Sequence, residues 1–192
     1  MAISTLSGRR CIITGASRGI GAAIAHRFAG EGAKCTLIGR NQATLEALSA
    51  SLLRDKFVEP NPHRIMVGDV AERSFWARLT VAERDVDVLV NAAGVTHYSL
   101  LVATQMKVVE EVVGTNLMGA VWGCQVMVKN MMRRKRGIVL VSMTTYMIVP
   151  VLMSFVGCII NVSSLLGVKG GKGSTAYAAS KAGIIGLCHF HL

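Results

Sequence analysis

Short apolar runs alternate with helix-patterned stretches along the chain as far as residue 134. Four runs have the length and apolar content of buried strands, at residues 10–13, 34–38, 64–67 and 86–90. Apolar residues at helical spacing follow them, at about 20–28, 45–52, 71–84 and 104–134. Strands and helices that alternate in this way form a parallel sheet with helices on both faces. The pattern predicts an α/β fold, a doubly wound parallel sheet in three α/β/α layers.

A fifth strand is expected at either of two places. Residues 137–142 and 157–164 have similar apolar patterns, and the segment between them is apolar but broken by Pro150. Residues 137–162 carry no charged side chain and are long enough to span a bilayer, so a membrane anchor is an alternative. Pro150 and the hydroxyl side chains around it favour a strand and an inserted segment instead.

Composition narrows the class of protein and of partner. A chain of 192 residues with 52% hydrophobic and 17% charged residues is typical of one globular domain, residues 1–192. The net charge of +10 favours an anionic partner, such as nucleic acid, a phosphorylated cofactor or an acidic carrier protein. Nucleic acid is disfavoured because the chain has no basic, aromatic-rich binding motif.

The cysteines and the N-terminus bear on location. The five cysteines are scattered, odd in number and form no C-x-x-C motif. They predict reduced thiols in an intracellular compartment, without a disulfide framework or a metal site. The first ten residues leave no room for a signal peptide and carry too few arginines for a convincing transit peptide. The cytoplasm and the mitochondrial matrix both stay open.

A glycine-rich turn follows the first strand with the spacing G-x-x-x-G-x-G and leads into the first helix. Glycines let a backbone approach a pyrophosphate, and the helix N-terminus offers free N–H groups and the positive end of a dipole. The residues expected to bind the cofactor here are Gly15, Ser17, Arg18, Gly19, Ile20 and Gly21.

The end of the second strand indicates which dinucleotide binds. An acid at this position accepts hydrogen bonds from the adenosine 2′-hydroxyl, but Arg40 and Asn41 stand here instead. Together with Arg18, Arg40 provides guanidinium groups that suit a 2′-phosphate, so NADP(H) is expected. The alternative is that Arg40 only caps a surface turn. Asp69 and Val70 are expected beside the adenine, and the remaining expected cofactor contacts are Asn91, Ala92, Ala93, Gly94, Tyr177 and Lys181.

Candidate catalytic side chains lie near the end of the chain. Tyr177 and Lys181 are four residues apart, so on a helix both side chains project from the same face. An ammonium beside a phenol favours the phenolate and makes the phenol a better proton donor near neutral pH. Ser164, at the end of an apolar strand, could form a hydrogen bond to the substrate oxygen that the phenol protonates. These groups favour proton donation to a carbonyl as hydride arrives, although an isolated Tyr-x-x-x-Lys pair is more often a solvated surface pair.

Together these motifs resemble the classical short-chain dehydrogenase/reductase family. The resemblance is carried by Thr14 to Gly21, Asp69, Asn91 to Gly94, Asn116, Ser164, Tyr177 and Lys181. The run from Tyr177 to Gly186 is similar to that of 3-oxoacyl-[acyl-carrier-protein] reductases, including carbonyl reductase-type relatives. The resemblance implies a Rossmann-like fold and a homo- or hetero-oligomer.

The resemblance also implies roles and a reaction. Tyr177 would donate the proton, and Ser164 would polarise the carbonyl. Lys181 would make the Tyr177 phenol a better proton donor and would hold the nicotinamide ribose. Asn116 would keep a water in a proton relay to Lys181, with a helix-packing amide as the alternative. The implied reaction is the NADPH-dependent reduction of a 3-oxoacyl thioester on an acidic carrier protein, or of a related ketone, as in fatty acid synthesis.

The chain departs from the family pattern at two places. The stretch from Gly94 to Ser164 is longer than in the family, and removing residues 137–156 restores the spacing, so we expect an in-frame insertion just before the fifth strand. The chain also stops before the family's last two strands, and we read His189 and His191 as a tail rather than a metal pair. We therefore expect the fifth strand to form an open sheet edge and activity to be weak. The alternatives are a catalytically silent variant that binds nucleotide or a full-length partner, and a membrane-anchored reductase.

Overall fold

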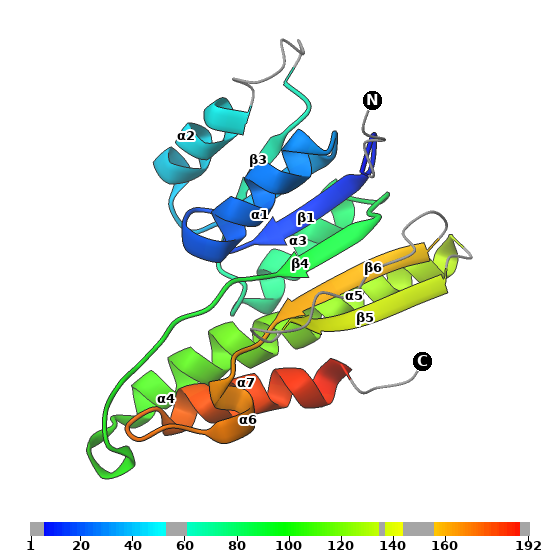
Figure 1. Ribbon diagram of the computed structural model, residues 1–192. Helices are drawn as coiled ribbons and strands as arrows, with labels where there is room; N and C mark the ends of the chain where they lie inside the picture. Colours follow the sequence, from blue (N-terminus) through cyan, green and yellow to red (C-terminus); the bar gives the residue numbers. More distant parts are fainter. Residues whose placement is uncertain (1–5, 53–60, 135–136, 144–155, 189–192) are drawn as a thin grey trace.

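The computed structural model describes residues 6–52, 61–134, 137–143 and 156–188 (Figure 1). Some sequence predictions fall outside these ranges. They are the middle of the expected insertion, residues 144–155, and the tail histidines His189 and His191.

A parallel sheet forms the centre of the fold, with the strand order β3-β2-β1-β4-β6-β5. Every pair of neighbouring strands is parallel. The strands are β1 (Arg10–Thr14), β2 (Lys34–Gly39), β3 (Arg64–Val67), β4 (Val88–Asn91), β5 (Gly137–Met143) and β6 (Val156–Val162). The chain builds outward from β1 in both directions, so the strand order reverses between β1 and β4. Ligands bind at such a switch point, at the carboxyl ends of the strands.

The helices begin and end close to the predicted stretches. They are α1 (Gly19–Gly30), α2 (Gln42–Leu52), α3 (Arg73–Ala82), η1 (Leu101–Ala103), α4 (Met106–Val113), η2 (Gly114–Met118), α5 (Gly119–Arg133), α6 (Leu166–Lys169) and α7 (Thr175–Cys188). The long helical region predicted over 104–134 forms, but η2 is a π-helical turn within it. Such turns often mark functional sites, and this one contains Asn116.

Two cores lie on the two faces of the sheet. Ile13, Leu37 and Val90 face one core, which α1 and α2 cover. In each of these strands, a residue adjacent to the one named faces the other core. That second core contains Phe75 and Trp76 of α3 together with residues of α5. Adjacent residues of a strand point to opposite faces, so strands that are apolar throughout need cover on both sides. The predicted three-layer α/β/α arrangement is confirmed.

Both candidate fifth strands form, and they lie next to each other. The later strand, β6, pairs with β4, with Cys158 opposite Val88. The earlier strand, β5, pairs with the outer side of β6, from Gly137 opposite Val156 to Met143 opposite Val162. The expectation that the fifth strand is an open edge was wrong, because β5 supplies a second ladder of hydrogen bonds. Whether residues 137–156 are an insertion stays a prediction.

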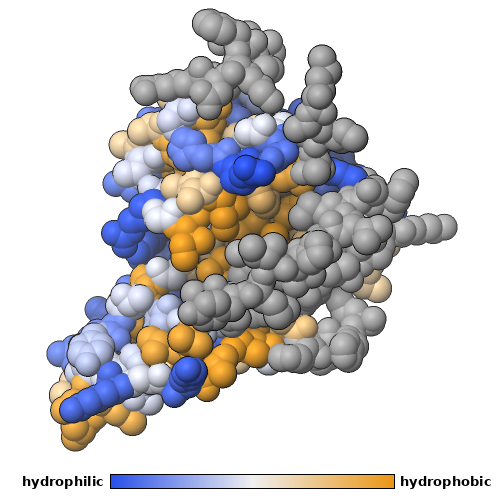
Figure 2. All heavy atoms as spheres, viewed as in Figure 1, coloured by the Kyte–Doolittle hydropathy of each residue, from blue (hydrophilic) through white to orange (hydrophobic). Residues whose placement is uncertain are grey.

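Figure 2 shows apolar side chains gathered at the lower left, where Figure 1 places the segment around η1 and the start of α4. The exposed large hydrophobic residues of this segment, here called the apolar lip, are Leu100, Leu101, Val102 and Met106. In the part of the chain that the structure describes, no helix is both long and apolar enough to cross a membrane. The two ends of the span considered as an anchor, residues 137–143 and 156–162, are strands of the sheet.

Candidate cofactor and catalytic site

The turn after β1 packs directly against the segment after β4. Gly15 has a positive φ of 66°, and a Cβ at this position would stand 2.6 Å from Cα of Ala93. Thr14 Oγ1 accepts hydrogen bonds of 3.1 Å from the backbone N–H groups of Ala92 and Ala93. Only glycine satisfies both the backbone conformation and the close approach at this point. The glycine turn and the segment from Asn91 to Gly94 therefore form one continuous wall.

The N-terminus of α1 opens toward the same space. Arg18 precedes the helix in an extended conformation, and no side chain caps the first turn. The first N–H groups of a helix have no partner within the helix and form a site for anions. Gly19 has a φ of 58°, and a Cβ there would meet no other atom within 4 Å. The arrangement fits a pyrophosphate close to the backbone.

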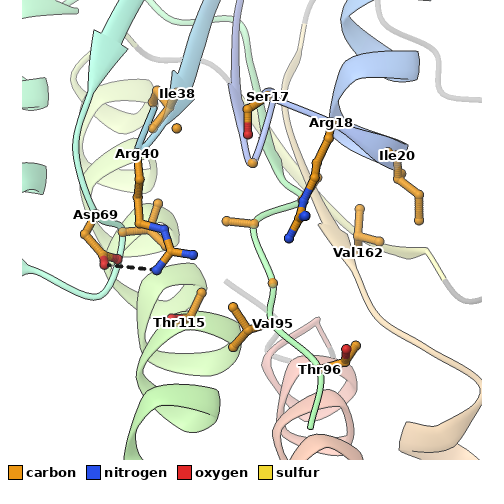
Figure 3. Close-up of a pocket in the computed structure, with 18 of the residues that line it drawn as sticks. Ser17, Arg18, Ile20, Ile38, Arg40, Asp69, Val95, Thr96, Thr115 and Val162 are labelled. Atoms are coloured by element: carbon orange, nitrogen blue, oxygen red, sulfur yellow. Dashed lines mark ion pairs between the residues drawn. The ribbon is translucent and has the colours of Figure 1, made fainter. Parts of the chain in front are cut away.

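One cavity of about 300 Å³ joins this turn to the ends of β2, β3, β4 and β6 and to α7 (Figure 3). It brings together most of the predicted site residues. Those that line it are Gly15, Ser17, Arg18, Gly19, Ile20, Gly21, Arg40, Asp69, Val70, Ala92, Ala93, Gly94, Tyr177 and Lys181.

Two arginines enter the cavity from opposite sides. Figure 3 shows Arg18 reaching in from the glycine turn and Arg40 from the end of β2. Arg40 Nη1 lies 3.8 Å from Asp69 Oδ2. Guanidinium groups in a cavity whose β2 end carries no acid suit a phosphate better than a ribose hydroxyl. The residues present therefore fit a phosphorylated dinucleotide.

Lys181 is buried at the other end of the cavity. Only 6% of the residue is exposed, and its Nζ donates a hydrogen bond of 2.7 Å to the carbonyl of Val162. Nζ also lies 5.8 Å from the centre of the Tyr177 ring. The predicted pairing of these two side chains on one helical face is present in α7.

Burial sets the charge of this lysine. Desolvation lowers the pKa of Lys181 to about 8, because removal from water disfavours the ammonium. A Cβ on Gly94 would stand 3.8 Å from Lys181 Nζ. The lysine is therefore packed against the segment that follows β4 and loses its proton near pH 8.

The side chain of Asn116 lies behind α7, the helix that carries Tyr177 and Lys181. Its Oδ1 accepts a hydrogen bond of 2.8 Å from the N–H of Val95, and its Nδ2 donates to the carbonyl of Val95 at 3.0 Å. Nδ2 also donates to Ser180 Oγ at 3.0 Å, and Ser180 Oγ donates to the carbonyl of Tyr177 at 2.7 Å. The side-chain amide of Asn116 thus ties the segment after β4 to α7, a role closer to the packing alternative than to direct water binding.

The two serines that follow β6, Ser163 and Ser164, form different hydrogen bonds. Ser163 lines the cavity, and its Oγ donates a hydrogen bond of 2.8 Å to the carbonyl of Lys181. Ser164 is half-buried and does not line the cavity, and its Oγ accepts a hydrogen bond of 3.2 Å from the N–H of Leu166. The proton of the Ser164 hydroxyl is not used in that bond, so it can be donated elsewhere.

Two more predicted cofactor residues have structural roles and do not line the cavity. Asn41 Oδ1 accepts a hydrogen bond of 3.1 Å from the N–H of Thr44, so Asn41 caps α2. Asn91 is buried at the end of β4, where its Nδ2 donates to Asn161 Oδ1 at 2.8 Å. That amide pair holds β4 and β6 together beneath the cavity.

Sequence reasoning missed several lining residues. They are Ile38, Gly39, Gly68, Val95, Thr96, Thr115, Val162 and Ser163. Most lie at or just after the carboxyl end of a strand, where the fold places its ligand, so strand ends were a usable signal for them. Thr115 lies inside a helical region, and no sequence signal pointed to it.

The chain belongs to the short chain dehydrogenase family. The family model matches residues 9–151 and 140–190, two stretches that overlap across part of the β5–β6 region. These matches cover more than half of the chain and include both the glycine turn and Tyr177.

Curated relatives carry the name of one reductase. The chain is 31% identical to a 3-oxoacyl-[acyl-carrier-protein] reductase of Bos taurus, over 92% of this chain and 65% of the relative. It is 32% identical to the Chlamydia trachomatis protein of that name and 33% identical to that of Thermotoga maritima, over 95% of this chain and 66% of each relative. The chain therefore spans just under two thirds of the length of these relatives.

Solved structures show the same fold. A Sinorhizobium meliloti protein, provisionally named a short-chain alcohol dehydrogenase, matches 96% of this chain and 66% of its own with a TM-score of 0.77 at 27% identity. A Beutenbergia cavernae protein provisionally named an NAD(P)-dependent gluconate 5-dehydrogenase, with NADP bound at low occupancy, matches 97% of this chain and 66% of its own at a TM-score of 0.76 and 26% identity.

Proposed function

We propose that this chain carries the site of an NADPH-dependent reductase that converts a 3-oxoacyl thioester, or a related ketone, to the hydroxy product. One observation carries the proposal. A single cavity has the glycine turn and two arginines at one end and Tyr177 with buried Lys181 at the other. A dinucleotide needs the first end, and proton donation at a carbonyl needs the second.

The roles of the residues follow from where they lie. Tyr177 donates its hydroxyl proton to the carbonyl oxygen, and Lys181 presents a buried cation beside that phenol. The family resemblance assigns the unused proton of Ser164 to the same oxygen, and Ser164 directly follows Ser163, which lines the cavity. Bound nicotinamide supplies the hydride. Asn116, through Ser180, fixes the helix that bears the acid.

An acyl thioester is favoured over a small ketone by two observations. The relatives are named for a substrate carried on acyl-carrier protein. The apolar lip begins four residues after Thr96, which lines the cavity, and Ser99 N–H donates to the carbonyl of Gly173 just before α7. An apolar chain leaving the cavity therefore has apolar surface nearby. The net charge of +10 suits an acidic carrier.

NADPH is favoured over NADH by Arg18 and Arg40, the cations at the nucleotide end. An intracellular, reducing compartment is favoured because none of the five cysteines, all of which lie in the described residues, forms a disulfide. We also propose that this chain forms an oligomer, either with further copies of itself or with a longer relative.

A second candidate is a nucleotide-binding protein without turnover. The observation that favours it is the position of Ser164, the group expected to polarise the carbonyl, which does not line the cavity. Such a protein binds dinucleotide through the glycine turn, or pairs with a longer relative, and reduces nothing.

Two measurements on purified protein test the proposal. Titration with NADPH and NADH reports binding, and oxidation of NADPH in the presence of an acetoacetyl thioester reports turnover. Binding with thioester-dependent oxidation supports the reductase, and binding without oxidation by any ketone supports the silent alternative. Absence of dinucleotide binding would contradict both.

A further inference from the structure

One ion pair joins two walls of the cofactor cavity. Arg40 follows β2 and Asp69 follows β3, and these strands are neighbours with Gly39 opposite Val67. Arg40 Nη1 lies 3.8 Å from Asp69 Oδ2, the contact drawn as a dashed line in Figure 3. Both residues line the cavity.

Asp69 is the fixed member of the pair. Its Oδ1 accepts a hydrogen bond of 2.9 Å from the N–H of Ala71, and its side chain is 31% exposed. The Arg40 side chain is 60% exposed, and its guanidinium stands at the end of a long, flexible stem. The backbone therefore anchors a carboxylate beside the guanidinium that is expected to receive a phosphate.

We propose that Asp69 is a specificity-determining residue that reduces the preference of this pocket for NADPH over NADH. The inference rests on the proposed function, because it takes Arg40 as the group that receives the 2′-phosphate. A phosphate must share the Arg40 guanidinium with Asp69 and is repelled by the carboxylate. A 2′-hydroxyl carries no charge and meets no such repulsion.

The size of the effect follows from exposure. Partly exposed ion pairs in water are weak and are screened by salt, so the selectivity changes by about twofold to fivefold rather than by orders of magnitude. The effect is largest at low ionic strength.

The test is the ratio of the NADH and NADPH dissociation constants in Asp69→Asn, measured by titration at low salt. The amide oxygen of asparagine can still accept from Ala71, so the turn is kept. We expect the ratio to rise about twofold to fivefold above that of the wild type. Asp69→Ser, which also keeps an acceptor, is the second variant if the first does not fold.

Two controls separate a local contact from net charge. Asp85→Asn removes a carboxylate that also faces arginines, 3.6 Å from Arg10 and 3.7 Å from Arg134, but lies outside the cavity. We expect this variant to leave the ratio unchanged. In an Arg40→Met background, Asp69→Asn is expected to raise the ratio less, because only the direct repulsion by the carboxylate is then removed.

The outcomes are distinct. An unchanged or lower ratio in both Asp69 variants overturns the proposal, and a lower one means that Asp69 mainly positions Arg40. An equal rise in Asp85→Asn, or a rise that is as large without Arg40, also overturns it. If the wild type binds neither dinucleotide, the proposed function itself fails. If the wild type binds NADPH and the ratio does not respond, only the role of Asp69 fails.

Discussion

The two ends of the cofactor cavity are shaped by different parts of the protein, backbone at one end and side chains at the other. At the nucleotide end the shape comes from backbone, with Gly15 against Ala93 and the open first turn of α1. At the catalytic end it comes from buried side chains, with Lys181, Asn116 and Ser180 in hydrogen bonds. The first end should be sensitive to added atoms, and the second to lost polar groups.

The largest effect is expected from Tyr177→Phe. The change removes the proton donor and keeps the ring beside Lys181. Turnover should fall by about 10²–10⁴-fold, the usual loss for a general acid, while NADPH affinity stays within about twofold. Thioester-dependent NADPH oxidation and NADPH titration measure the two. Tyr98→Phe, on a residue 79% exposed, is the control, and near-full turnover in Tyr177→Phe would remove this residue as the acid.

Gly15→Ala and Gly19→Ala form the next comparison. Both glycines have positive φ, which costs an alanine about 1–2 kcal/mol. Only at Gly15 does the new Cβ meet backbone, so Gly15→Ala should lose about 1–3 kcal/mol more and bind NADPH poorly. Denaturant unfolding and NADPH titration measure this, and equal losses in the two variants would show that close approach to Ala93 is unimportant.

A smaller effect is expected from Ser180→Ala at the catalytic end. The change removes one partner of Asn116 and the bond to the carbonyl of Tyr177, which should cost about 1–3 kcal/mol of stability. Turnover should fall about threefold to tenfold with little change in the Michaelis constant. Ser174→Ala is the matched control, since Ser174 is also buried and donates to a carbonyl three residues earlier, that of Gly171. Equal kinetics in both variants would argue against this role of Ser180.

The smallest effect is the dependence of stability on pH. Burial lowers the pKa of Lys181 from 10.5 to about 8, so above about pH 8 the unfolded chain holds a proton that the folded chain has lost. Stability should therefore rise with pH in this window, by about 1 kcal/mol between about pH 7 and about pH 9 relative to Lys181→Met. Urea unfolding at several pH values checks this, and parallel curves for the two proteins would contradict it.

The nucleotide end was the easier end to predict from sequence. The glycine spacing indicates the shape of the backbone, and Arg18 and Arg40 indicate the charge of the site. These glycines and both arginines line the cavity. Asn41 and Asn91 were assigned to the cofactor because they sit inside motifs. Sequence position does not show which way a side chain points, and both are used within the fold.

The catalytic end and the sheet edge needed the structure. Spacing predicted the Tyr177–Lys181 pair, but not the hydrogen bonds of Ser163 and Ser180 that hold it, because those join segments distant in sequence. The spacing from Gly94 to Tyr177 also indicated the later of the two segments as the fifth strand, and β6 does pair with β4. No sequence signal placed the earlier segment, β5, on the outer side of β6, because that pairing is set by three-dimensional packing.

The contact of Thr14 with Ala92 and Ala93 has a consequence for the time at which the pocket forms. The hydrogen-bonded groups are 78 and 79 residues apart in sequence. Bringing together such distant groups is slow compared with forming a local turn. The glycine turn cannot reach its final shape until β4 has docked beside β1. During synthesis the ability to bind dinucleotide therefore arises only after the segment beyond residue 93 has emerged, so cofactor affinity reports that this half of the sheet is assembled.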